Sequence, residues 1–122
     1  MNKICTNIEQ SKQLIELGID VNTADMMWDD WRLIDDGWKI FVGYDPEIEQ
    51  DFGRKCYPAW SLSALMELIQ DDIKIEKTLF DQSDMFTYSI IGDGYEYRSH
   101  EHECLLDAAF EFVCWILENK NQ

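Results

Sequence analysis

Hydrophobic residues recur at helical spacing in three stretches of the chain. The first begins at Thr6, has Glu9 at the spacing of a capping box, and ends at Gly18, which can supply a left-handed cap. The second covers residues 61–70, and the third covers residues 101–119. Because the third stretch is apolar around most of its circumference, we expect a helix that packs centrally against a sheet.

Shorter apolar segments between these helices predict five strands, over residues 26–34, 38–44, 73–80, 85–91 and 95–99. Asp35-Asp36-Gly37 and Gly92-Asp93-Gly94 have the composition of hairpin turns, because glycine adopts a positive φ at little cost. Across the second turn, the candidates for cross-strand packing are Tyr88, Ile90, Tyr95 and Tyr97.

The resulting order is helix, two strands, helix, three strands, helix. It predicts an α+β fold with about three helices on a mainly antiparallel sheet of about five strands. The 122 residues fit a single domain over residues 1–122. With 46% hydrophobic residues, including five Trp, six Phe and five Tyr, the chain has enough apolar surface for a core and does not resemble a disordered protein.

Acidic residues outnumber basic ones by 25 to 10, which gives a formal charge of −15. Such a charge repels nucleic acids and anionic membranes, so we expect neither as a partner. It favours a protein partner with a basic surface. No apolar run approaches the ~20 residues of a membrane span, and the first residues lack a signal-peptide pattern. These features predict a cytoplasmic protein.

The four cysteines are Cys5, Cys56, Cys104 and Cys114, and no two have Cys-x-x-Cys spacing. In a reducing compartment we expect all four to be free thiols. Cys56 follows Arg54 and Lys55, and nearby positive charge favours a reactive thiolate. A cysteine nucleophile would also need a base, which only His100 or His102 could supply as imidazole. The alternative, which we favour, is that Cys56 is an ordinary small residue on a strand before Pro58.

Both histidines of the chain lie in the segment from His100 to Cys104. On a strand, His100 and His102 share a face, whereas on a helix His100 and Cys104 lie one turn apart. Either arrangement supplies two metal ligands, but a structural zinc site takes about four. A polar helix start accounts for the same residues. We therefore predict no metal, no cofactor and no catalytic residues.

The segment around Trp28-Asp29-Asp30-Trp31 mixes large aromatic and acidic side chains. On a strand, Trp28 and Asp30 share one face and Asp29 and Trp31 share the other. If one face is core, the other exposes an aromatic ring beside a carboxylate, an arrangement typical of protein interfaces. The alternative is that both tryptophans are buried. We predict that Asp29, Asp30 and Trp31 form part of a contact with a partner.

Three blocks of sequence carry a resemblance to a known family: residues 14–20 with 23–26, residues 57–65, and residues 107–110 with 113–120. In these blocks the chain resembles a family of small proteins of anaerobic gut bacteria and of their phages and mobile elements. That family usually has a proline after the first block, where Val21-Asn22 stands here. The resemblance implies a shared fold and carries no biochemical activity.

These observations favour a non-enzymatic protein-binding or regulatory module of the kind carried on a phage or mobile element. Two alternatives stay open. One is an acidic mimic of nucleic acid that inhibits a DNA-binding protein, which would need carboxylates along one extended face. The other is a small metal-dependent or cysteine enzyme built on His100, His102 and a cysteine.

Overall fold

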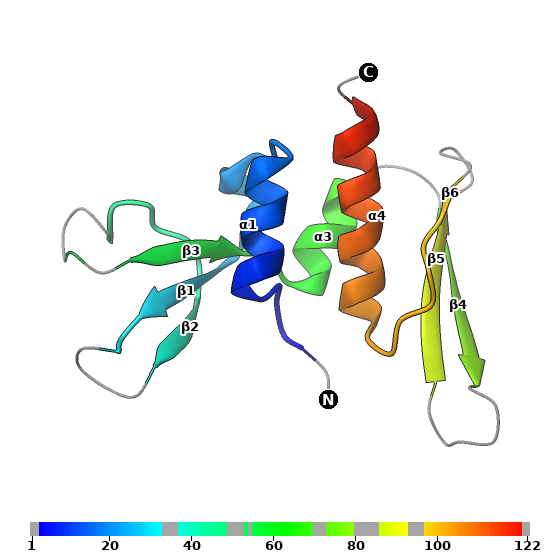
Figure 1. Ribbon diagram of the computed structural model, residues 1–122, viewed down its shortest axis with the longest axis horizontal. Helices are drawn as coiled ribbons and strands as arrows, with labels where there is room; N and C mark the ends of the chain where they lie inside the picture. The colour runs from blue at the N-terminus through cyan, green and yellow to red at the C-terminus, as the bar shows by residue number, and fades with distance from the viewer. Residues whose placement is uncertain are drawn as a thin grey trace.

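A computed structural model describes residues 3–32, 37–48, 53, 55–69, 73–79, 86–92 and 97–120. The described residues form three α-helices: α1 (Ile8–Glu16), α3 (Leu62–Leu68) and α4 (Leu105–Lys120). A short 3₁₀ helix, η1 (Val21–Thr23), follows α1. The helices make a middle layer, and one three-stranded sheet lies on each side of it (Figure 1).

The first sheet has β1 (Met26–Asp30) at its centre, between β2 (Trp38–Val42) and β3 (Cys56–Ala59), with both pairings antiparallel. β3 is not among the five predicted strands, although a strand before Pro58 is one interpretation of Cys56, because a proline within a short segment counts against a strand. The pairing shows why Pro58 is tolerated. Asp30 N–H donates to Lys55 C=O, so the backbone groups of Asp30 and of every second residue before it face β3. Met27, which lies opposite Pro58, is not one of these residues, so no ladder hydrogen bond needs an N–H from Pro58.

The second sheet has β5 (Phe86–Gly92) at its centre, between β4 (Ile73–Leu79) and β6 (Tyr97–Arg98). Tyr97 lies opposite Gly92, and Tyr88 pairs instead with His102. Tyr97 therefore does not lie opposite Tyr88. Tyr97 stacks on Trp115 of α4, with ring centroids 4.5 Å apart. Tyr95 and the turn residues Asp93 and Gly94 lie outside the described residues, as do Asp35 and Asp36.

The α+β class and the three helices are confirmed, whereas the single five-stranded sheet and the order of elements are wrong. The described part of the chain contains six strands in two separate sheets, in the order helix, three strands, helix, three strands, helix. Sequence periodicity shows which segments are extended, but it does not show which of them pair.

Both ends of α1 are explained by hydrogen bonds. The N-cap is Asn7, whose side chain accepts from Gln10 N–H while the Gln10 side chain accepts from Asn7 N–H. The expected capping box is thus present one residue later than predicted, because Thr6 bonds elsewhere. At the other end Gly18 has φ +92° and Ile19 N–H reaches Leu14 C=O, so the predicted left-handed cap is confirmed.

Helix α4 begins at Leu105, four residues later than the sequence predicts. His102 both donates its N–H to Tyr88 C=O and accepts from Tyr88 N–H, at 2.9 and 2.6 Å. This bridge continues the pairing along β5 after β6 has ended, and it holds residue 102 in an extended conformation. A sheet contact therefore overrides the helical pattern of the segment.

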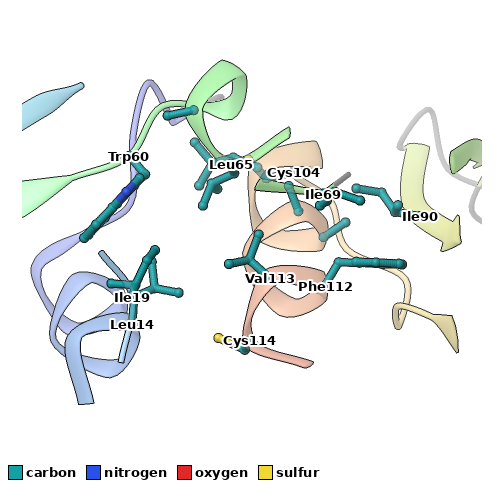
Figure 2. Packing of buried hydrophobic residues seen from close by; sticks show 14 residues of the cluster. Leu14, Ile19, Trp60, Leu65, Ile69, Ile90, Cys104, Phe112, Val113 and Cys114 are labelled. Carbon is teal, nitrogen blue, oxygen red and sulfur yellow. The ribbon is translucent and has the colours of Figure 1, made fainter. Parts of the chain in front are cut away.

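The core lies among the three helices and β5. Figure 2 shows the cluster as a band that runs from Trp60 and Leu14, past Leu65 and Val113, to Ile90 of the second sheet. Trp60 is fully buried, and its indole N–H donates to the Thr23 hydroxyl at 2.9 Å. None of the helices in the described ranges is long and apolar enough to cross a membrane.

Candidate functional site

A groove of about 450 Å³ opens on the first sheet. Most of the side chains that line it are apolar or aromatic. The described lining residues are Met27, Asp29, Trp31, Phe41, Val42, Gly43, Tyr44, Asp45 and Ile48. Among them only Asp29 and Asp45 are charged, and both are acidic.

The floor of the groove is one face of the sheet. Met27, Asp29 and Trp31 alternate along and just beyond β1, so their side chains point to the same side. Phe41 lies directly opposite Met27 on β2 and remains 39% exposed. The rings of Trp31 and Phe41 are 6.2 Å apart between centroids and tilted by 35°. Two aromatic rings therefore lie side by side at the open surface.

Asp29 fixes the position of Trp31. Asp29 is only 2% exposed, and its carboxylate accepts a hydrogen bond from the Trp31 indole N–H at 3.1 Å. Trp31 N–H donates to Gly37 C=O, which holds the backbone against the start of β2. Lys39 is the direct cross-strand neighbour of Asp29, so a cation stands beside the buried carboxylate. Hydrogen bonds therefore hold Trp31 at its backbone N–H and at its indole N–H.

The rim of the groove comes from the segment after β2. Gly43 has φ +92°, a conformation that other residues rarely adopt, and its N–H donates to Asp25 C=O at 2.7 Å. This bend turns the chain so that Tyr44, Asp45 and Ile48 line the groove. Asp45 also accepts the N–H of Glu47, which closes the following turn.

The structure brings together two of the three residues predicted for a partner contact. Asp29 and Trp31 line the groove. The side chain of Asp30 points to the opposite face of the sheet, because neighbouring residues on a strand alternate between its faces. There Arg32 donates two hydrogen bonds to the Asp30 carboxylate, at 2.9 and 2.7 Å, which lower the pKa of that carboxyl. On the same face as Asp30, the Trp28 indole N–H bonds to Thr6 C=O.

A second polar cluster surrounds Glu111 of α4. Its carboxylate accepts hydrogen bonds from the Tyr97 hydroxyl at 2.6 Å and from His100 N–H at 3.0 Å. It also lies within hydrogen-bond distance of a ring nitrogen of each histidine, His100 Nδ1 at 3.0 Å and His102 Nε2 at 2.8 Å. Of the two arrangements open for the histidines, the extended one is therefore observed, and Cys104 is not part of the cluster.

Electrostatics keep Glu111 ionised. Burial raises its pKa, but the hydrogen bonds from Tyr97, His102 and His100 outweigh burial and lower the pKa to about 2. Burial also raises the pKa of Tyr97, and the Glu111 carboxylate adds to this effect. The cluster ties the segment before α4 to the helix. Glu111 and Tyr97 carry no local sequence signal, because the contacts join residues 9 to 14 positions apart.

The remaining residues considered for catalysis or metal binding do not lie together. Cys56 belongs to β3 of the first sheet, whereas His102 pairs with β5 of the second sheet, on the other side of the helices (Figure 1). The two do not form a nucleophile and base. Within the described ranges, no three His, Cys, Asp or Glu side chains are grouped so that they could hold a metal ion.

The four cysteines are free and buried. Burial, together with the negative charge of Asp25, raises the pKa of the Cys5 thiol to about 11. Burial and the nearby Glu118 and Glu111 raise the pKa of Cys114 to about 12. Both thiols are therefore protonated at neutral pH, and a protonated buried thiol is a poor nucleophile.

Comparison of the chain with protein-family models, with curated proteins and with solved structures finds no match.

Proposed function

We propose that this protein is a non-enzymatic protein-binding module whose groove accepts an apolar side chain flanked by lysine or arginine on a partner protein. The observation that carries the proposal is the groove itself, in which the Trp31 and Phe41 rings lie beside each other over a buried carboxylate. The resemblance to proteins of phages and mobile elements, and a cytoplasmic location, are part of the same proposal.

The shape of the groove supports an apolar anchor. A volume of about 450 Å³ is within the range of small-ligand sites and accommodates a single large side chain. Trp31 is held by Asp29, so little conformational freedom is lost when a partner packs on it. Aromatic residues that become buried when a partner binds supply much of the binding energy at protein interfaces.

The charge of the molecule supports basic residues beside that anchor. The described lining contains two acids and no base, in a chain whose net charge is −15. A basic partner would be attracted over a distance set by the ionic strength, so its association should slow as salt is added. An acidic partner would be repelled.

A defined peptide tests this proposal without knowledge of the natural partner. Isotope-labelled protein is titrated with acetyl-Lys-Lys-Leu-Lys-Lys-amide and monitored by nuclear magnetic resonance. We expect shifts at Met27, Trp31 and Tyr44, and weaker binding as salt rises. Peptides with serine in place of leucine, or glutamate in place of lysine, should bind more weakly. Shifts that map elsewhere, or equal binding of the acidic peptide, would contradict the proposal.

Three substitutions test whether binding requires the groove or only some exposed apolar surface. Phe41→Ala should weaken peptide binding by about fivefold or more, the loss expected of a residue that anchors an interface. Ile15→Ala is a matched control, because Ile15 on α1 is also 39% exposed but lies away from the groove. Trp31→Ala should likewise weaken binding without unfolding the protein. If it unfolds the protein, Trp31 is a core residue and not a contact.

A further inference from the structure

The outer edge of the second sheet is open. Among the residues that the structure describes, β4 has a single neighbouring strand, β5, and it forms the outermost strand of the molecule on that side (Figure 1). It is seven residues long and contains no proline. A strand of this kind presents unpaired backbone groups that can pair with another strand.

The hydrogen bonds of β5 show which residues of β4 face the open edge. Tyr88 and Ile90 direct their backbone groups toward His102 and Ser99, on the side of β6. The backbone groups of the alternate residues Ser89 and Ile91 therefore face β4, where Ser89 lies opposite Glu76 and Ile91 lies opposite Lys74. By the same alternation, Ile73, Ile75, Lys77 and Leu79 direct their N–H and C=O groups outward.

The side chains of β4 are suited to pairing with a strand. Ile75 is 44% exposed and Leu79 is 58% exposed, and alternation along the strand places both on one face. On the opposite face, Glu76 forms an ion pair with Arg98 at 2.6 Å, and Lys74 lies two residues before Glu76. Apolar and charged positions therefore alternate from Ile73 to Glu76, whereas Lys77 stands on the same face as Ile75 and Leu79.

We propose that β4 pairs in antiparallel fashion with β4 of a second copy of this chain, with Ile75 opposite Ile75 of the second copy. In this register Lys74 faces Glu76 of the second copy, and the symmetry repeats this pair, so two opposite-charge pairs form. A twofold axis at Glu76 or at Lys77 would place like charges directly opposite, which is destabilising. The charge pattern of β4 thus favours this register over those centred on Glu76 or Lys77, and its complementary charges suit a second copy of the same strand.

One pair of strands is a small interface compared with the ~1,600 Å² of a standard stable complex. Two chains of charge −15 also repel each other. The dimer should therefore dissociate on dilution. Peptide binding in the groove, which lies on the other sheet, does not depend on this pairing, so the two proposals can fail separately.

Cysteine cross-linking tests the register. Lys74 and Glu76 direct their backbone groups toward β5, so in the proposed dimer they form a pair without mutual hydrogen bonds, in which side chains are closest. Lys74→Cys and Glu76→Cys proteins are each oxidised alone and as a mixture, after circular dichroism confirms folding. We expect a disulfide-linked dimer from the mixture and little from either variant alone. Wild-type protein is the control, because its four cysteines are buried.

Sedimentation tests whether the edge is used at all. Wild-type protein should shift from monomer toward dimer as its concentration rises to about 1 mM, a range that detects even weak association. Ile75→Pro should stay monomeric, because it removes an N–H that faces the open edge and leaves the β4–β5 ladder intact. Ile75→Val keeps that N–H and should still dimerise.

Three results would overturn the proposal: wild-type protein that is monomeric at every concentration, an Ile75→Pro variant that dimerises as well as wild type, or rapid cross-linking of Glu76→Cys alone, which would place the axis at Glu76.

Discussion

Single residues in this protein hold together segments that are far apart in the sequence. Glu111 accepts hydrogen bonds from Tyr97 and His100 and meets the ring of His102, so one carboxylate joins β6, the following segment and α4. Thr6 acts similarly: its hydroxyl bonds to Ser11 and accepts Trp60 N–H, while its own N–H donates to Trp60 C=O. Thr6 therefore anchors the start of α1 to the chain after β3.

Replacing Glu111 with Gln should destabilise the protein in a pH-dependent way. The folded pKa of Glu111 is about 2, below its ordinary value of 4.5. The ionised carboxylate therefore stabilises the fold fully above about pH 4.5, and this contribution is lost as the pH falls toward 2. We expect Glu111→Gln to lower the free energy of unfolding at pH 7 by about 1.5–3 kcal/mol, the range for hydrogen bonds to a charged group. Urea unfolding measures the difference.

The gap between wild type and Glu111→Gln should shrink between pH 4.5 and pH 2. Glu118→Gln, on the same helix but exposed, is the control and should change stability by less than about 0.5 kcal/mol. A gap between Glu111→Gln and wild type that widens below pH 4.5 would refute the assigned role of the carboxylate.

At the scale of elements, local signals place helix ends well when no distant strand competes. The end of α1 illustrates this, because Gly18 and Ile19 form the predicted cap from their own sequence. The start of α4 shows the opposite, since pairing of His102 with Tyr88 delays the helix to Leu105. The extra strand β3 is a further example: it forms because β1 offers an edge on which a proline costs no ladder bond.

The cap at Gly18 can be tested by substitution. Gly18 has φ +92°, and an added Cβ would meet nothing within 4 Å, so any cost comes from backbone strain alone. We expect Gly18→Ala to lower the free energy of unfolding by about 1–2 kcal/mol. Gly18→Asn should cost less, because asparagine adopts the left-handed conformation more readily. Thermal unfolding compares the three proteins, and an alanine variant as stable as wild type would refute the requirement for glycine.

At the scale of the whole molecule, negative charge opposes folding into a compact shape. The chain carries a net charge of −15, and the core must offset that repulsion. Charges repel over about 30 Å at 0.01 M salt but only over about 8 Å at 0.15 M. We therefore expect the free energy of unfolding to rise as sodium chloride increases from 0.01 to 0.15 M at pH 7, measured by urea unfolding.

The same measurement near pH 4.2, where the sequence has no net charge, is the control. There the dependence on salt should largely disappear. A protein that loses stability on addition of salt at pH 7 would show that specific ion pairs, such as Arg98–Glu76 and Arg32–Asp30, outweigh the general repulsion.

The sequence by itself determined the class of the fold, the three helices, most of the strands and the cap of α1. These follow from periodicity and from residues adjacent in the chain, whose interactions are local. It also placed Asp29 and Trp31 on one strand face, because alternation along a strand is a property of the backbone. The same alternation placed Asp30 on the opposite face, but it did not show which of the two faces carries a groove.

Only the tertiary structure decided which strands pair, that they form two sheets rather than one, and that Glu111 gathers Tyr97 and both histidines. It also decided that the chain after Gly43 bends to line a groove. The physical reason is the same in each case. Strand pairing and side-chain contacts across many residues depend on competition between distant segments for the same backbone groups and the same buried space, and that competition leaves no local pattern in the sequence.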